Sequence, residues 1–328
     1  MPIGINPLVD YAFKMLFGNE LHKPVTSHFL NSVLVGQTPI VSISFPNPIR
    51  GKQTADGKLF ILDVLAVDQL GRQINIEVQI SLPSGMAKRM VFYAADTYVR
   101  PLPEGQNYNA LQPSINICVL AGSLFRHPAK LHLDFRLREK SLPLTLTDDL
   151  QIHFLQLSHL EITADTLDNA TPVERWCWFL CHADELTTDQ VAQLLPEQEF
   201  AEAAGVLEMI ARTPDQLREY NARLKAQRDE EARLLYAQQQ GIEIGEARGE
   251  ARGEARGEAR GEARGEARGE ARGEARGIRK GQLCGQIMLL QQLLKQPVSA
   301  DDQLAACSIE QLQLLHTELR QRLNLGDT

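Results

Sequence analysis

Two acidic side chains occupy neighbouring apolar runs, at positions that would bring them together. Asp63 falls within the run 59–67, Glu77 falls within the run 73–80, and a short connection that contains a glycine separates the two runs. Runs of this kind around such a connection predict a β-hairpin. If the hairpin turns midway between them, Asp63 and Glu77 are directly opposed on one face, with their Cβ atoms roughly 5 Å apart. Gln79 joins the same face, because alternate residues of a strand point to the same side.

Opposed carboxylates repel each other, and this repulsion costs free energy unless a cation lies between them. A hard divalent cation such as Mg²⁺ accepts carboxylate oxygens and keeps water ligands for chemistry. The residues alone leave a simpler alternative open, in which Asp63 marks a solvent-facing position of its strand. The metal interpretation has the advantage that it explains why two acids stand opposite each other.

Side chains on two predicted helices could serve such a site. Asp10 and Lys14 are four residues apart in the first helix. Asp10 either approaches the metal or caps the helix N-terminus, and Lys14 either contacts phosphate or pairs with Asp10. Arg89 and Tyr93 share one face of a later helix, with Lys88 beside them. This face either binds a phosphate backbone or consists of a solvated arginine and a packed tyrosine.

Hydrophobic periodicity predicts the elements that position these residues. Helical spacing predicts a helix over 7–35, interrupted near 18–24, and an amphipathic helix over 86–100. Besides the hairpin, an apolar strand is predicted over 114–120 and an edge strand over 132–136. The order of helix, strands, helix and strand indicates an α/β or α+β architecture.

Beyond residue 150 the pattern is helical. Helices are predicted over 174–182, 188–194, 198–211 and 214–243. Cys177, Cys181 and His182 lie at helical spacing, but the neighbouring tryptophans favour core packing over zinc binding. A final apolar-periodic segment predicts a small helical hairpin broken at Pro297.

The tetrapeptide Gly-Glu-Ala-Arg repeats eight times without error over residues 245–276. In a helix, like charges would stack four residues apart, and each glycine would cost about 1 kcal/mol relative to alanine. Both effects oppose an isolated helix. The repeat is therefore interpreted as a spacer or a weak helix, with self-association of the charged segment as the alternative.

Composition limits the class of protein. The 328 residues carry a net charge of −8, but residues 1–140 hold 14 Lys+Arg and 10 Asp+Glu, a mildly basic balance that is compatible with a polyanionic ligand.

No apolar run is long enough for a membrane span, and the N-terminus lacks a secretory signal. The five cysteines show neither metal-type nor framework spacing. These features predict a cytoplasmic protein. The sequence contains neither a nucleotide-binding glycine loop nor a Gly-x-Ser-x-Gly elbow.

An Asp, a hairpin and a Glu-x-Gln on the next strand form a motif that resembles the PD-(D/E)xK nucleases. Two further segments narrow the resemblance, Asp10-Tyr-Ala-Phe-Lys-Met-Leu-Phe-Gly18 and Arg89-Met-Val-Phe-Tyr93. With them, the chain resembles the Rpn family of recombination-promoting nucleases, often labelled transposases. The resemblance covers about residues 5–140 closely and continues more loosely through residues 174–180.

The resemblance implies a restriction-endonuclease-like α/β core, a mixed sheet flanked by helices, followed by a mainly helical C-terminal region. Together with the pattern beyond residue 150, it divides the chain into a nuclease-like domain (1–150), a helical region (151–243), the repeat (244–278) and a helical hairpin (279–328). The implied activity is DNA phosphodiester hydrolysis dependent on Mg²⁺ or Mn²⁺ and linked to recombination or transposition. A further interpretation of the C-terminal helical region and the repeat makes them an assembly module that forms a homo-oligomer.

Carried over residue by residue, the resemblance makes Asp63 and Glu77 metal ligands and puts Gln79 where the family usually has lysine. Glutamine can orient a water molecule but supplies no charge, so slower or more metal-dependent cleavage is expected. Asp10 is the expected further acid of the site. The alternative function is a weak or inactive DNA-binding or interaction protein on the same scaffold. The expected DNA contacts are Lys14, Lys88, Arg89 and Tyr93.

Overall fold

The computed structural model describes residues 1–46, 49–50, 60–102, 105–125 and 127–325. Residue 59, the expected start of the first hairpin strand, lies outside these ranges. The chain forms two compact units, residues 1–235 and residues 236–328. The helix α7 (Pro214–Leu293) contributes its first turns to the first unit and its last turns to the second.

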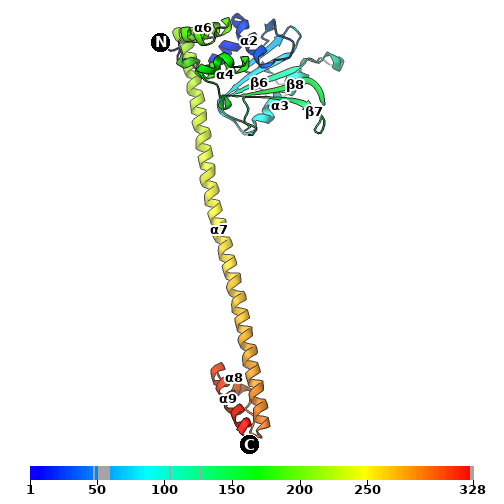
Figure 1. Ribbon diagram of the computed structural model, residues 1–328, viewed down its shortest axis with the longest axis vertical. Coiled ribbons are helices and arrows are strands. Elements are labelled where there is room, and N and C mark those ends of the chain that lie inside the picture. Colours follow the sequence, from blue (N-terminus) through cyan, green and yellow to red (C-terminus); the bar gives the residue numbers. More distant parts are fainter. Residues whose placement is uncertain (47–48, 51–59, 103–104, 126, 326–328) are drawn as a thin grey trace. The chain divides into compact units, whose positions relative to one another are not determined.

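In the first unit the helices are α1 (Asp10–Phe17), α2 (Lys23–Val33), α3 (Met86–Val99), α4 (Pro172–His182), α5 (Thr188–Leu194) and α6 (Gln198–Arg212) (Figure 1). The strands are β1 (Ile43–Ser44), β2 (Ile49–Arg50), β3 (Phe60–Ile61), β4 (Val64–Asp68), β5 (Gln73–Gln79), β6 (Ser114–Leu120), β7 (His132–Arg138) and β8 (Thr145–Gln156). Short 3-10 helices lie at Glu20–His22, Tyr108–Ala110, Leu157–His159, Ala164–Asn169 and Ala183–Glu185.

Among the described residues, six strands form one mixed sheet in the order β1-β4-β5-β6-β8-β7. The central pairs β5–β6 and β6–β8 are parallel, while β4–β5 and β7–β8 are antiparallel. The strand expected over 132–136 is confirmed as an edge strand, β7. β2 and β3 pair separately as a two-stranded sheet.

The register of the β4–β5 hairpin is the predicted one. Val64 pairs with Ile76 and Val67 pairs with Gln73, so residues 63 and 77 are the next opposed positions. The connection closes tightly because the Asp68 carboxylate accepts the backbone N–H groups of Leu70 and Arg72, each at 2.9 Å. Gly71 has a φ of +79°, a conformation that glycine adopts without steric cost.

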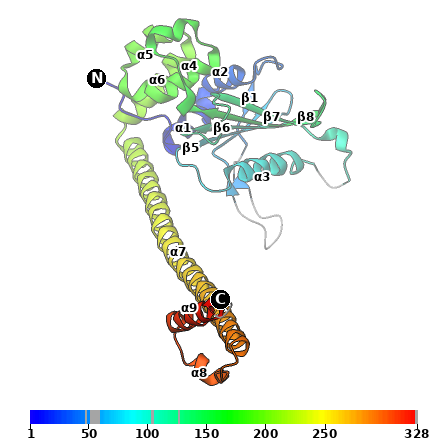
Figure 2. The ribbon, with the colours of Figure 1, turned by 60° about the horizontal axis from the view of Figure 1, so that its bottom comes forward.

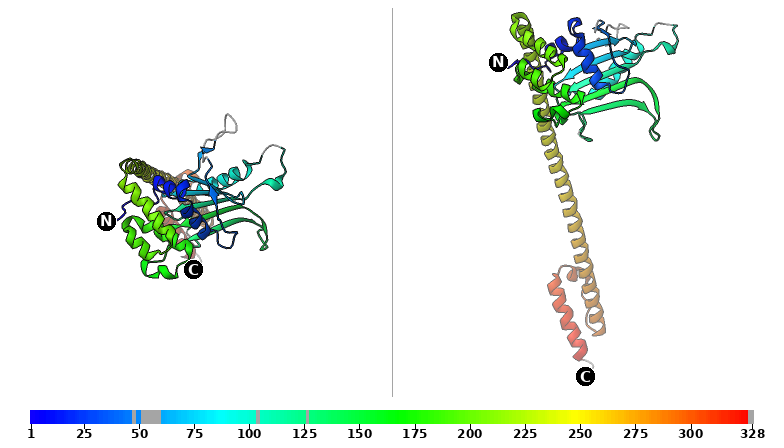
Figure 3. Two further views of the ribbon diagram at one scale, coloured as in Figure 1. Left: turned by 90° about the horizontal axis from the view of Figure 1, so that it is seen from above. Right: turned by 45° about the horizontal axis from the view of Figure 1, so that its top comes forward.

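Helices cover both faces of the sheet (Figure 2). Alternate side chains of β5, including Ile74 and Ile76, join the apolar core formed with α1, α2, α4 and α6. α3 covers the other face, where Met90 packs against Leu65 and other side chains of the sheet. The face of β5 that carries Asn75 and Glu77 is therefore covered rather than open to solvent. Figure 3 shows the β7–β8 hairpin projecting away from α4–α6.

Two capping boxes fix the starts of α4 and α5. Thr171 and Glu174 bond reciprocally at the start of α4, and Thr187 and Gln190 do so at the start of α5. These helices bring Trp176 and Cys177 into the main core, where both are fully buried. Core packing is thus confirmed for Cys177.

The strand β8 is an element that the sequence analysis missed. Its first half carries Asp148 and Asp149, and its second half carries buried polar side chains such as Gln151 and His153, which obscure the apolar alternation. Residue 150, the expected boundary between the nuclease-like domain and the helical region, lies inside this strand. The four-part division otherwise stays a prediction.

The repeat is α-helical throughout, which agrees with its interpretation as a weak helix. Glycine at every fourth position weakens the helix, but alanine, glutamate and arginine are strong helix formers. Both flanking segments are helical as well, so the repeat extends a helix that is already nucleated. All side chains of residues 245–276 are exposed.

In the second unit, the last turns of α7 pack against α8 (Asp301–Ala305) and α9 (Ile309–Leu325) through an apolar cluster. Ile287 and Leu312 are its fully buried members. The chain leaves α7 after Leu293, shortly before Pro297, so the predicted hairpin is confirmed. Among the described residues, no helix has the length and apolar character needed to cross a membrane.

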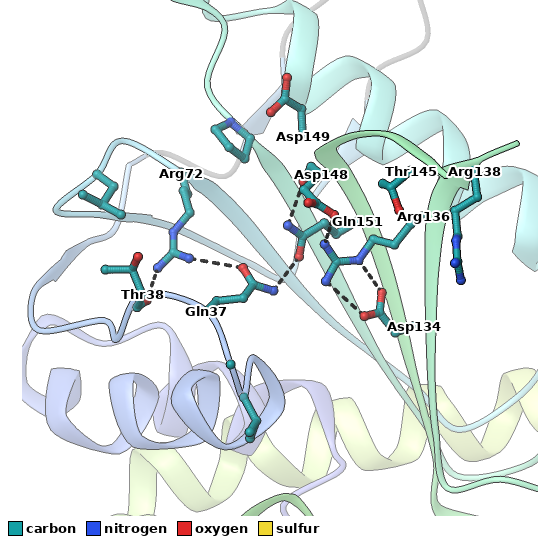
Figure 4. Close-up of a pocket in the computed structure, with 14 residues that line it drawn as sticks. Gln37, Thr38, Arg72, Asp134, Arg136, Arg138, Thr145, Asp148, Asp149 and Gln151 are labelled. Carbon is teal, nitrogen blue, oxygen red and sulfur yellow. Dashed lines mark hydrogen bonds and ion pairs between the residues drawn. The ribbon is translucent and has the colours of Figure 1, made fainter. Parts of the chain in front are cut away.

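A buried ion pair anchors the hairpin to the loop that follows α2. Arg72 Nε lies 2.5 Å from Asp68 Oδ2, and the Arg72 and Asp68 side chains are 7% and 0% exposed. The same guanidinium donates to the carbonyl oxygen of Thr38 at 2.9 Å and to Gln37 Oε1 at 3.3 Å. Figure 4 shows the links from Arg72 to Thr38 and Gln37 and the further hydrogen bond from Gln37 to Gln151.

We expect the substitution Arg72→Ala to lower the free energy of unfolding by about 3–5 kcal/mol, because it leaves the Asp68 carboxylate buried without its partner. Urea unfolding of the first unit measures this effect. The matched control is Arg218→Ala, whose exposed pair with Asp215 should contribute little. Similar losses in the two variants would contradict a structural role for the buried pair.

Candidate metal centre

The Asp63 and Glu77 carboxylates each accept a backbone N–H from the opposite strand at the end of the hairpin. Glu77 Oε1 accepts the backbone N–H of Asp63 at 3.3 Å, and Asp63 Oδ2 accepts the backbone N–H of Val78 at 3.1 Å. The β4–β5 ladder ends at the pair of Val64 and Ile76, so the two carboxylates act as acceptors just where the strand separates. The hairpin thereby fixes both acidic side chains.

The site is closed to water on the Glu77 side. The Glu77 side chain is 0% exposed, and that of Asp63 is 16% exposed. This burial argues against the solvent-facing alternative for Asp63. Glu77 Oε1 also accepts a hydrogen bond from Asn75 Nδ2 at 3.2 Å. Glu77 Oε2 is buried and has no hydrogen-bond partner among the described residues.

Two cations approach the acids from opposite faces of the sheet. From α1, Lys14 Nζ lies 3.4 Å from Asp63 Oδ1 and 2.6 Å from Asp10 Oδ1. From α3, Arg89 Nη2 lies 3.6 Å from Glu77 Oε2. Arg89 Nε also donates to the Tyr93 hydroxyl at 2.7 Å, which orients the guanidinium toward the acid.

The ionisation of the two acids reflects burial more than ion pairing. Burial raises the pKa of Asp63, and the charge of Lys14 offsets part of this effect. Burial and the charge of Asp63 together raise the pKa of Glu77 to about 8. Burial lowers the pKa of Lys14, but the hydrogen bond to Asp10 and the charge of Asp63 raise it by more. The net effect is a raised pKa, so the ammonium keeps its proton.

A pocket of about 310 Å³ opens beside Asp63. Asp10 and Gln79 line it on the side of the sheet, and residues of α7 line it on the other. Asp10 begins α1 but is not its N-cap, a position that Val9 occupies. The Gln79 side chain is half-buried and has no hydrogen-bond partner among the described residues, so it can bind a ligand or a water molecule.

The remaining expected DNA contacts differ in their surroundings. Lys88 is exposed, and no hydrogen bond or ion pair is described for it. Tyr93 is 6% exposed and packs in the core under α3, so it acts on the site through Arg89. The structure thus brings Lys14 and Arg89 to the acids and leaves Lys88 on the surface.

The donor set fits a divalent cation that keeps most of its water. The buried Glu77 Oε2, which accepts no hydrogen bond from a described residue, and the neighbouring Asp63 carboxylate offer oxygen ligands of the kind that Mg²⁺ prefers. Within the described residues, no cluster of three or more His, Cys, Asp or Glu side chains could enclose a metal. Two carboxylates supplemented by water and substrate phosphate match the usual way in which proteins bind Mg²⁺.

A larger pocket, of about 650 Å³, lies at the other end of the parallel strands. Arg72 precedes β5 and Pro113 precedes β6, whereas the acids lie near the end of β5, which is about 20 Å long. Arg136 in this pocket already pairs with Asp134 at 2.6 Å and with Asp148 at 2.9 Å (Figure 4). Arg136 and these two acids compensate one another, and this pocket contains neither Asp63 nor Glu77, so the smaller pocket is the better candidate for chemistry.

Sequence reasoning missed two features of the site. Asn75 is buried beside Glu77, and only its position two residues earlier on the same strand face hinted at a role. The polar α7 residues that line the pocket, Arg223, Gln227 and Glu230, lie far away in the sequence. No local pattern could place them near Asp63, because that proximity arises from the packing of α7 on the core.

The mixed sheet, covered by helices on both faces, has a restriction-endonuclease-like α/β fold. The chain belongs to the PD-(D/E)XK nuclease family transposases, whose family model matches residues 7–237. This match confirms the resemblance to PD-(D/E)xK nucleases, which generally use divalent metals and act on DNA. No curated protein and no solved structure matches the chain.

Without metal, we expect the stability of the first unit to fall as pH rises from 5 to 8. Glu77 ordinarily loses its proton near 4.5 but holds it to about 8 in the fold. Between these values the folded state binds more protons than the unfolded state, so raising the pH favours unfolding. The expected loss is on the order of 2–4 kcal/mol, measured by urea unfolding in chelator.

The substitution Glu77→Gln should flatten this dependence, because glutamine does not titrate. Mg²⁺ added at pH 8 should stabilise the wild type more than the variant. An equally steep loss of stability in the variant would show that other groups cause the pH dependence.

Proposed function

We propose that the protein is a metal-dependent DNA endonuclease that hydrolyses phosphodiester bonds with Mg²⁺ or Mn²⁺ in recombination or transposition. The observation that carries the proposal is the opposed pair Asp63 and Glu77, buried at the end of the hairpin, with one Glu77 oxygen that accepts no hydrogen bond from a described residue. Membership of the nuclease family supports DNA as the substrate. The basic balance of residues 1–140 is compatible with it.

In this mechanism Asp63 and Glu77 would hold the metal through Asp63 Oδ1 and Glu77 Oε2, the oxygens not occupied by backbone N–H groups. A divalent ion bound there would lower the pKa of an attacking water and offset charge on the phosphate. Gln79 orients that water through its free carboxamide. Arg89 donates toward the phosphate oxygens from the α3 side.

We assign to Lys14 the electrostatic role that lysine of the Glu-x-Lys motif has in related nucleases. Its ammonium is 3.4 Å from Asp63 Oδ1, although it comes from α1 rather than from β5. Asp10, 2.6 Å away, holds the ammonium in place and keeps it charged. A positive charge at this point stabilises negative charge that develops on the phosphate.

A second candidate function is DNA binding without cleavage, which the glutamine at position 79 favours. DNA binding that persists in chelator, with no cutting in Mg²⁺ or Mn²⁺, would support it. The proximity of Lys14 to Asp63 argues for the nuclease, since it supplies the charge that Gln79 lacks.

We expect wild-type protein to nick supercoiled plasmid in Mg²⁺ or Mn²⁺ and Asp63→Ala to reduce the rate at least a hundredfold, about the effect of losing a principal electrostatic group. Asp215→Ala, which removes an exposed acid of α7, is the control. Thermal melting verifies that each variant folds. Equal nicking by the wild type and the Asp63 variant in every metal would refute the proposal.

The role of Lys14 has a separate test. Lys14→Ala should slow cleavage by about a hundredfold, because it removes the charge beside the acids. Adding Gln79→Lys to that variant should restore much of the rate, because it places an ammonium at the usual motif position. Single-turnover rates at saturating DNA measure both effects. Failure of the second lysine to restore any activity would indicate that Lys14 acts only through its bond with Asp10.

A further inference from the structure

The first turns of α7 are fixed to the nuclease unit. The Tyr220 side chain is 4% exposed, and its hydroxyl accepts the backbone N–H of Asn6 at 3.0 Å. Leu217 and Leu224 pack against the main core on either side of Tyr220. The position of this segment beside α1 is therefore set by burial as well as by a hydrogen bond.

One face of this helix segment lines the pocket that contains Asp63. Arg223, Ala226, Gln227 and Glu230 are its lining residues, and their spacing of three, four and seven residues places them on one side of the helix. Asp10, Asp63 and Gln79 line the facing wall. The pocket thus has one wall from the sheet and α1 and another wall from α7.

Arg223 differs from the other cations around the pocket. It is exposed, and no hydrogen bond or ion pair is described for it. Lys14 already pairs with Asp10, and Arg233 pairs with Glu230, the acid of the α7 wall, at 3.5 Å. A free guanidinium in a polar pocket is suited to bind a phosphate, which it can contact through two parallel hydrogen bonds.

We propose that Arg223 binds a backbone phosphate of duplex DNA next to the phosphate held at Asp63 and Glu77. The proposal rests on the proposed nuclease function and extends it to the substrate: α7 forms the second wall of the DNA-binding cleft. Arg223 is a substrate-binding residue in this arrangement. Gln227, one turn further along and also without a described partner, extends the same polar wall.

The test compares the full-length wild type with Arg223→Ala, Arg223→Lys and the matched control Arg228→Ala. Arg228 is exposed on the same helix, has no described ion pair and does not line the pocket. Binding of a fluorescein-labelled DNA duplex is measured by anisotropy in Ca²⁺ over a series of KCl concentrations. Single-turnover cleavage in Mg²⁺ or Mn²⁺ is measured at saturating DNA.

We expect Arg223→Ala to raise Kd by about tenfold, the loss of one charge-assisted contact. The slope of log K against log salt should decrease in magnitude by about one, since one phosphate contact is lost. Arg223→Lys, which keeps the charge, should retain the salt slope. Cleavage at saturating DNA should change much less than Kd, because Arg223 does not touch the reacting atoms.

Equal Kd values and salt slopes for the Arg223 and Arg228 alanine variants would overturn the inference, even if the wild type cleaves DNA. Conversely, a wild type that binds DNA through Arg223 but cleaves it in no metal would support the role of α7 in DNA binding and refute the proposed nuclease activity. A wild type that neither binds nor cleaves DNA would overturn both.

Discussion

Two carboxylates held against each other in a space that largely excludes water are the constraint on which the site depends. Each accepts a backbone N–H from the opposite strand, so neither can rotate away, and the repulsion instead helps to raise the pKa of Glu77 to about 8. The hairpin register sets their separation, and α3 and α1 close the two faces around them. The Arg72–Asp68 pair anchors the hairpin. The folding free energy of the hairpin therefore offsets the cost of holding the two acids close together.

The negative charge of the two acids is compensated from both faces of the sheet. Lys14 from α1 compensates Asp63, while Arg89 from α3 compensates Glu77. Neither cation lies within the hairpin, so docking of the helices determines the local electrostatics. A PD-(D/E)xK motif with glutamine in its last position can consequently keep a positive charge at the site, because the charge comes from another element of the fold.

Local sequence patterns predicted much of the fold. The apolar runs around a glycine-containing turn defined the β4–β5 register, and with it the opposed positions of Asp63 and Glu77. The same patterns did not show that the face of β5 with Asn75 and Glu77 is buried, because its cover, α3, is placed there by tertiary packing. β8 was missed because its polar residues face a network of hydrogen bonds that only the assembled sheet creates. The α7 wall could not be predicted from the sequence for the same reason, since Arg223 and Asp63 come to line one pocket only through tertiary packing.

The period of the Gly-Glu-Ala-Arg repeat has a geometric consequence now that the tract is helical. Four residues advance by about 400° around an α-helix, so every repeat is rotated by about 40° relative to the one before. Across the eight repeats each residue type therefore spirals almost once around the helix in a right-handed sense. No straight seam of one chemical character exists for a conventional left-handed coiled coil to use. A neighbouring helix lying along this tract would meet glycine, acid, alanine and base in turn.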